Sequence, residues 1–244
     1  MQVGKKYNGE KAIISLTSWK ARINTVAKTL FNLIKNCPGF HIVLVLSEEE
    51  FPLKEKELPE NLMLFVDNEL IEILWIYPNY KSFKKWIFTS KKYPNVPIIT
   101  ADDDCVYTCN YAQKLYDAWI NSKKQCIITN DGGNKPTLKW PRGPNTLYTY
   151  SYFKNIDLDL LCKEYFKQKF TFVEEDVVFG LIAKKLGIEI IDLKRLNKFN
   201  SIYYLFHDEI NPQSTKGWNF TKRYNILHVF IDSIWNKIYR PSKV

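Results

Sequence analysis

The sequence predicts an α/β fold with a mostly parallel sheet, and two observations carry that prediction. Short apolar runs of β-type residues alternate along the chain with segments whose apolar residues recur at helical spacing. Polar residues follow directly after two of these runs, as expected where the carboxyl ends of parallel strands form a binding edge. The 244 residues are enough to bury a core and few enough for a single domain.

The first half of the chain shows the alternation clearly. Strands are expected at 12–16, 41–46, 62–66, 71–76, 97–100 and 126–129, and helices at 21–35, 80–93 and 111–123. In the first helix, Val26, Leu30 and Leu33 lie on one face, and Pro38 and Gly39 follow its end. The runs at 41–46 and 126–129 are short, apolar and rich in β-branched residues, which favours buried strands.

The second half is less regular. We expect an irregular loop at 136–144, strand-like structure at 146–153 and 188–191, and helices at 158–169, 177–186 and 224–239. Gly187 ends the helix before it. The last helix carries apolar residues on one face and basic residues near its end, which fits either packing on the domain or contact with an anionic membrane.

The composition leaves several partner classes open. The net charge of +9 attracts nucleic acid, anionic lipid or phosphorylated small molecules, and charge alone does not choose among them. The five cysteines form no Cys-x-x-Cys pair, so we expect free thiols in a reducing cytoplasm. Neither a signal peptide nor a run of about 18 apolar residues is recognisable, so we expect a soluble or peripheral protein.

The sharpest feature is a run of three aspartates after the run at 97–100. Adjacent carboxylates repel one another, and a bound Mn²⁺ or Mg²⁺ would relieve the repulsion while also accepting phosphate oxygens. In an extended segment, Asp102 and Asp104 point to one side and Asp103 points to the other. The alternative is a solvated acidic turn or a cap for a helix that starts near Asp104.

Three segments together resemble a known family. They are Ile14-Ser-Leu-Thr-Ser-Trp-Lys-Ala-Arg-Ile, Ser82-Phe-Lys-Lys-Trp and Ile99-Thr-Ala-Asp-Asp-Asp-Cys-Val-Tyr. The chain, from about residue 12 to about 190, resembles bacterial glycosyltransferases of the GT-A fold with an Asp-x-Asp motif, which build capsule and lipo-oligosaccharide chains. The resemblance implies a GT-A-like (Rossmann-like) mixed, mostly parallel sheet flanked by helices, with a C-terminal helical tail. It divides the single domain 1–244 into a nucleotide-sugar-binding half at 12–130, an acceptor half at 131–222 and a helix at 223–244.

The resemblance also implies roles for individual residues. Asp104 would ligate the metal, and Asp102 would contact the ribose or help to coordinate the metal. Lys85 would face the donor phosphates. The nucleotide-sugar pocket would further include Thr17, Ser18, Arg22 and Asp103. For Arg22 and Lys85 the alternative is an ordinary solvated side chain on a helix.

Acceptor chemistry is expected near the segment Phe172-Val-Glu-Glu-Asp-Val-Val-Phe-Gly. A sugar hydroxyl is a poor nucleophile, so a carboxylate must take its proton as the new bond forms. Asp176 is the first candidate for this base and Glu175 the second, which would favour inversion at the anomeric carbon. The alternative is that both carboxylates simply stabilise a helix N-terminus. His207 is the candidate for a further metal ligand, although a single histidine is often structural.

One local feature limits the transfer from this family, and the role of a second is open. Arg142-Gly-Pro-Asn-Thr-Leu-Tyr contains one glycine where the expected relatives have a glycine-rich turn, so acceptor specificity does not carry over. Asn130-Asp-Gly-Gly borders the acceptor or is a tight turn, and its composition favours the turn.

The sequence thus predicts transfer of a sugar from a nucleotide-sugar, with a UDP-sugar as first choice, to a glycan or a lipid-linked acceptor. The protein would act in the cytoplasm, with contact at the inner membrane face left open. A nucleotidyl or phosphoryl transferase would also use clustered aspartates and metal, but glycine for a phosphate-binding loop is scarce. A nucleic-acid-binding module would fit the positive charge and the aromatic residues, but three aspartates repel a phosphate backbone. We therefore expect no nucleic-acid partner.

Overall fold

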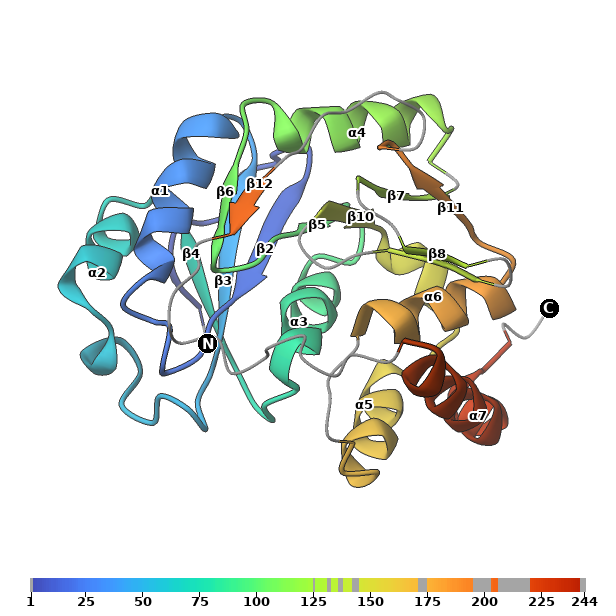
Figure 1. Ribbon diagram of the computed structural model, residues 1–244. Coiled ribbons are helices and arrows are strands. Elements are labelled where there is room, and N and C mark those ends of the chain that lie inside the picture. Colours follow the sequence, from blue (N-terminus) through green and yellow to red (C-terminus); the bar gives the residue numbers. More distant parts are fainter. Residues whose placement is uncertain are drawn as a thin grey trace.

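The computed structural model describes residues 2–124, 126–130, 133–135, 138–141, 145–170, 175–194, 203–205 and 220–241. Its centre is an eight-stranded sheet with the strand order β1-β4-β3-β2-β5-β10-β7-β11 (Figure 1). Six strands run in one direction, and β1 and β10 run in the other. The strands of this sheet are β1 (Gln2–Gly4), β2 (Ile13–Thr17), β3 (His41–Ser47), β4 (Glu72–Ile76), β5 (Ile98–Thr100), β7 (Cys126–Thr129), β10 (Thr146–Tyr148) and β11 (Glu189–Asp192).

Helices cover both faces of the sheet (Figure 1). Buried residues of α1, α2 and α4 belong to the core on one face, and those of α3, α5, α6 and α7 belong to the core on the other. The α-helices are α1 (Val26–Asn36), α2 (Glu60–Asp67), α3 (Lys84–Lys92), α4 (Tyr111–Asn121), α5 (Leu158–Lys167), α6 (Glu175–Lys185) and α7 (Phe220–Ile238). Short 3₁₀ helices are η1 (Lys54–Glu57), η2 (Lys81–Phe83) and η4 (Tyr150–Phe153).

The central strands explain the continuous apolar runs in the sequence. Every residue of β3 is buried, because helices cover both of its faces. Along β5 the side chains alternate, so that Ile99 packs in the core with α1 and Ile98 packs in the core with α3. The predicted class is confirmed as an α/β mixed sheet, most of whose strands run in one direction, with flanking helices and a C-terminal helix, and the GT-A-like assignment remains a prediction.

Several predicted elements are wrong in type or in extent. The run at 62–66 is part of helix α2, not a strand, and it buries Leu62 and Val66 four residues apart. The first helix begins only at Val26, after a turn. The strand expected at 146–153 ends at Tyr148 and continues as η4. The segment expected to be an irregular loop contains part of a hairpin, β8 (Gly133–Lys135) paired with β9 (Leu138–Trp140).

A second small sheet lies beside the aspartate run. Strand β6 (Cys105–Tyr107) begins immediately after Asp104 and pairs with β12 (Tyr203–Leu205). A helix cap at Asp104 was one alternative to the metal site, and it is wrong, because the chain makes a tight turn from β5 into β6. This tight turn between β5 and β6 therefore positions the aspartates.

The C-terminal helix is packed on the domain. Its buried face, which includes Leu227, Ile231 and Ile234, belongs to the core shared with α5 and α6. Packing on the domain, which was one of the two interpretations of its amphipathic pattern, thus accounts for that pattern. Among the described helices, none combines the length and the apolar character that crossing a membrane requires.

Candidate active site

The candidate site lies at the carboxyl ends of the adjacent parallel strands β2 and β5. Ser15 pairs with Thr100 in the sheet, and the Ala101 N–H donates to the Ser15 carbonyl at 2.9 Å. The residues that follow each strand therefore leave the sheet side by side. This register, set by the cores on both faces, brings Ser18 next to the aspartate run although 85 positions separate Ser18 from Asp103.

Asp103 is the buried anchor of the turn. Its side chain accepts a hydrogen bond from the Ser18 hydroxyl at 2.6 Å and forms an ion pair with Arg22 at 2.9 Å. Burial raises the pKa of Asp103 to about 6, although Arg22 and Ser18 act in the opposite direction. The Thr29 hydroxyl of α1 donates to the Asp103 carbonyl at 3.0 Å and so ties the same turn to the helix layer. A direct contact of Asp103 with nucleotide remains a prediction.

Arg22 joins two of the aspartates. Its Nη1 lies 2.9 Å from Asp103 Oδ1 and 2.6 Å from Asp104 Oδ2. The Nε of Arg22 is buried and has no hydrogen-bond partner. Arg22 precedes α1 in a turn, and only 16% of its side chain is exposed, so it is not the solvated helix residue of the alternative interpretation.

Lys85 links Asp102 to the second acidic segment. This lysine, near the start of α3, is only 4% exposed, and its Nζ lies 2.6 Å from Asp102 Oδ1 and 3.2 Å from Glu175 Oε1. Burial alone would lower the pKa of Lys85, but these two carboxylates and that of Asp176 outweigh burial and raise the pKa. The ammonium group therefore remains charged and holds the aspartate turn to the first residue of α6.

Both carboxylate oxygens of Glu175 are engaged, by Lys85 and by Ser82. Its second carboxylate oxygen, Oε2, accepts a hydrogen bond from the Ser82 hydroxyl at 2.5 Å. Asp176, the next residue of α6, is half-buried and close enough to influence the pKa of Lys85 and of the buried Tyr148. Glu175 therefore has a partner on each carboxylate oxygen, and both Glu175 and Asp176 lie in the first turn of a helix, where carboxylates are favourable.

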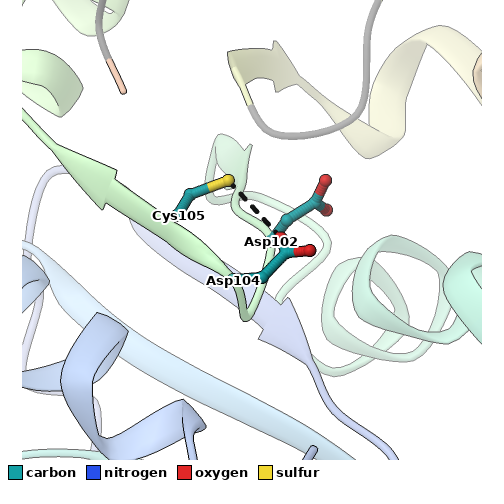
Figure 2. Close-up of side chains that lie close together, drawn as sticks. All are labelled: Asp102, Asp104 and Cys105. Carbon is teal, nitrogen blue, oxygen red and sulfur yellow. Dashed lines mark hydrogen bonds between the residues drawn. The ribbon is translucent and has the colours of Figure 1, made fainter. Parts of the chain in front are cut away.

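The ligand set at the turn suits a hard divalent cation. One oxygen of Asp102, one oxygen of Asp104 and the sulfur of Cys105 lie within 4.8 Å of one another, and Figure 2 shows the three side chains grouped at the turn between β5 and β6. The Cys105 thiol points to Asp104 Oδ1 at 3.6 Å. Burial and the neighbouring Asp102 and Asp104 raise the pKa of this thiol far above its ordinary value. Mn²⁺ and Mg²⁺ prefer oxygen ligands, so the two carboxylates are the groups that would hold such an ion.

Two other predicted residues lie outside this cluster. Thr17 is the last residue of β2, and its hydroxyl donates to the Val45 carbonyl on the neighbouring strand at 2.7 Å. His207 lies outside the described residues. Their roles in nucleotide and metal binding remain predictions.

Three further residues support the turn and were not selected from the sequence. Ser82 holds Glu175, Thr29 donates to backbone carbonyls of the turn, and the Tyr107 hydroxyl accepts a hydrogen bond from the Asp102 N–H at 2.7 Å. Thr29 carried a usable signal, because it is a polar residue on the apolar face of α1. For Ser82 the available signal was its place in the segment Ser82-Phe-Lys-Lys-Trp, three residues before Lys85.

A hollow elsewhere in the structure includes none of the predicted site residues. It has a volume of about 290 Å³ and lies between α6 and α7, lined by Leu181, Lys184, Lys185, His228, Ile231 and Asp232. Its charged side chains pair with each other, as Lys185 and His228 both do with Asp232. The candidate catalytic residues therefore lie in the cluster at the strand ends and not in this hollow.

Comparison with known proteins adds little to this geometry. No protein-family model matches the chain, and no curated protein matches it. A structure of the glycosyltransferase GlyE of Streptococcus pneumoniae TIGR4 is similar at 11% identity with a TM-score of 0.45, over 97% of this chain and 66% of that one. The apo form of GlyE is similar at 10% identity with a TM-score of 0.41, over 96% of this chain. The chain spans only 66% of the length of these structures, and likeness at this level assigns neither a family nor an activity.

Proposed function

We propose that the protein is a metal-dependent glycosyltransferase that moves a sugar from a nucleotide-sugar, a UDP-sugar as first choice, to a hydroxyl of a glycan or lipid-linked acceptor. The observation that carries the proposal is the pair Asp102 and Asp104 at the carboxyl ends of β2 and β5, with Lys85 and Arg22 bound directly to it. Strand ends of this kind are where α/β sheets bind nucleotides. The motif segments that resemble GT-A glycosyltransferases supply these same residues.

Electrostatics favour a divalent cation in the bound state. Among the described residues of the cluster, Asp102, Asp103, Asp104 and Glu175 pair with two cations, Arg22 and Lys85, and Lys84 lies close enough to Asp103 for their charges to interact. A diphosphate brings further negative charge, and its binding beside these carboxylates needs an added positive charge. Mn²⁺ or Mg²⁺ held by Asp102 and Asp104 would supply that charge and would stabilise the departing nucleoside diphosphate.

Lys85 is the protein's own contribution to leaving-group stabilisation. The pKa of this buried ammonium is raised, so it carries a full charge at neutral pH. A fixed charge in a site that excludes water stabilises developing negative charge without reorganisation. Glu175 would then orient Lys85, and Asp176, one residue further along α6, would be the base, as the resemblance implies.

The finer assignments rest on the resemblance. A carboxylate base that activates the acceptor directly favours inversion, and the related enzymes build capsule and lipo-oligosaccharide chains. Lipid-linked acceptors would place the protein at the inner face of the cytoplasmic membrane, which the exposed Ile226 and Val229 on α7 support. A hexosyltransferase of this kind is the activity we propose.

Ligand-induced thermal stabilisation tests the proposal. Nucleoside diphosphates and nucleotide-sugars are screened with Mn²⁺, Mg²⁺ or EDTA against the wild type, Asp104→Asn and the exposed control Asp67→Asn. A ligand at 100 times its Kd stabilises the native state by about 2.7 kcal/mol. At about 3 °C per kcal/mol for a chain of this size, the midpoint should rise by about 8 °C. We expect this rise only with metal, in the wild type and in Asp67→Asn but not in Asp104→Asn.

The same screen separates the rival functions. No shift with any nucleotide, together with tight, salt-sensitive binding to DNA or RNA, would replace the transferase by a nucleic-acid-binding module. Metal-dependent nucleotide binding in which a nucleoside triphosphate is turned over, and a nucleotide-sugar is not, would identify a phosphoryl or nucleotidyl transferase.

A further inference from the structure

Two asparagines at the end of the main sheet have buried amide groups without hydrogen-bond partners. Asn130, directly after β7, is 2% exposed, and Asn145, directly before β10, is completely buried. The unpartnered atoms are Oδ1 of Asn130 and both Oδ1 and Nδ2 of Asn145. Buried amides in folded proteins are nearly always paired, so this pair needs an explanation.

The row of residues next to these asparagines is fully paired. Thr146 lies opposite both Thr100 and Thr129 in the sheet, and its hydroxyl donates to the Thr129 hydroxyl at 3.0 Å. The Thr100 hydroxyl donates to the Thr146 carbonyl at 3.2 Å. The sheet therefore satisfies these hydroxyl groups up to its last residues, and the terminal amide row is left without partners.

The amide row leads to the aspartate turn. The Asn130 N–H donates to the Asn145 carbonyl at 3.1 Å, which extends the pairing of β7 with β10 by one residue. The same extension of the β10–β5 register sets Asn145 opposite Ala101, the residue before Asp102. Residues opposite each other in an antiparallel pair lie about 5 Å apart on one face of the sheet. Asn130, Asn145 and Ala101 thus form one row across the end of three strands, on the face that α1 and α4 cover. Asp102 is the next residue along the chain after Ala101 and is bonded to Lys85 of α3.

We propose that Asn145, with Asn130, forms a subsite that hydrogen-bonds hydroxyl groups of the sugar carried by the nucleotide donor. An amide offers both a donor and an acceptor, which matches a hydroxyl group that also donates and accepts. The sugar is bonded directly to the diphosphate, so a donor held at Asp102 and Asp104 places its sugar near the neighbouring row. This inference rests on the proposed function and assigns the part of the ligand that the carboxylate pair does not contact.

Leucine substitutions separate the sugar from the nucleotide. Asn145→Leu and Asn130→Leu keep the branching at Cγ and remove the amide, although leucine is the larger side chain, and Asn225→Leu on the exposed side of α7 is the control. Isothermal titration in Mn²⁺ measures Kd for UDP and for UDP-glucose, UDP-galactose and UDP-N-acetylglucosamine. We expect the Kd of UDP to stay within about twofold in all variants, while the tightest UDP-sugar binds about tenfold more weakly in Asn145→Leu. The unfolding midpoint of each variant shows whether the larger leucine is tolerated at its buried site.

The outcomes are distinct. Unchanged affinity for every UDP-sugar in both leucine variants, with UDP still bound, overturns the subsite and leaves the proposed function intact. Unchanged donor affinity with a raised KM for the acceptor overturns the donor assignment and moves the subsite to the acceptor. If neither UDP nor a UDP-sugar binds the wild type, the UDP-dependent function fails, and the sugar subsite fails with it. Should Asn145→Leu fold poorly, Asn130→Leu carries the same comparison.

Discussion

Replacing Glu72 with glutamine should destabilise the protein without affecting ligand binding. Glu72 is the first residue of β4 and lies at the amino-terminal end of the parallel strands, whereas the candidate site lies at their carboxyl ends. Neither Glu72 nor His41 has exposed surface. Its carboxylate meets His41 Nε2 at 2.7 Å, Lys92 Nζ at 2.8 Å and the Tyr93 hydroxyl at 2.6 Å. One buried carboxylate therefore holds together the starts of β3 and β4 and the end of α3.

The expected loss follows from these three contacts. Removing one partner of a buried ion pair costs about 3–5 kcal/mol. Glutamine preserves the shape and one acceptor oxygen, so we expect the lower end, about 3 kcal/mol. For a chain of this length that corresponds to a fall of about 9 °C in the midpoint of thermal unfolding.

The loss should depend on pH in a defined direction. Burial alone would raise the pKa of Glu72, but the hydrogen bonds from its three partners outweigh burial and lower the pKa in the folded protein. Unfolded glutamate has a pKa of about 4.3. The stabilisation is therefore fully present above that pH and disappears as the pH falls through the lower pKa of the folded state.

Urea unfolding at pH 7 and at several values below pH 4.3 checks this reasoning, with the exposed Glu69→Gln as control. The difference in unfolding free energy between wild type and Glu72→Gln should be large at pH 7 and should shrink steadily in acid. Equal stability of the two proteins at pH 7 would refute the assignment of Glu72 as a buried ionised anchor. A difference that grows in acid would refute the direction of the pKa shift.

Two further changes test the site and the C-terminal helix. Asp176→Asn should lower kcat for UDP release from a UDP-sugar by about 10²–10⁴-fold, with little change in the Kd of UDP. Glu175→Gln should mainly raise the KM for the donor, because Glu175 holds Lys85. Equal losses of kcat in the two variants would contradict this division of roles. Ile231→Ala in α7 should cost about 2–5 kcal/mol in urea unfolding, because Ile231 is completely buried, whereas Val229→Ala, 68% exposed, should stay within about 0.5 kcal/mol. Similar effects of the two alanine variants would mean that α7 is not packed on the domain.

The sequence specified the sheet better than the boundaries of its neighbours. The runs at 41–46 and 126–129 are strands because helices on both faces require continuous apolar side chains there, and that requirement is visible in the sequence. The run at 62–66 carries the same kind of signal, and a short apolar run does not distinguish a strand from a buried helix face. Pro59 directly before α2 was the available clue, since proline is tolerated at a helix start.

For the site, the sequence indicated which residues matter but not how they pair. The aspartate run and the cations at 22 and 85 were identified by motif, and the structure places them in one cluster. Which carboxylate Lys85 contacts depends on the position of α3 over the sheet, and the engagement of Glu175 by Ser82 joins residues 93 positions apart. Contacts of this range follow from packing of the layers, which no local pattern records.

Pairing also changes the argument for a metal ion. The sequence alone predicts that three adjacent carboxylates need a bound cation to keep the folded state stable. In the structure Arg22 binds two of them and Lys85 binds the third, so the folded chain already supplies counter-charges. EDTA should therefore leave the unfolding midpoint of the free protein unchanged and abolish only its increase by nucleotide. The case for Mn²⁺ or Mg²⁺ then rests on the ligand, because a diphosphate must approach a cluster in which carboxylates outnumber cations. A large loss of stability on removing metal from the free protein would restore the structural role that Arg22 and Lys85 make unnecessary.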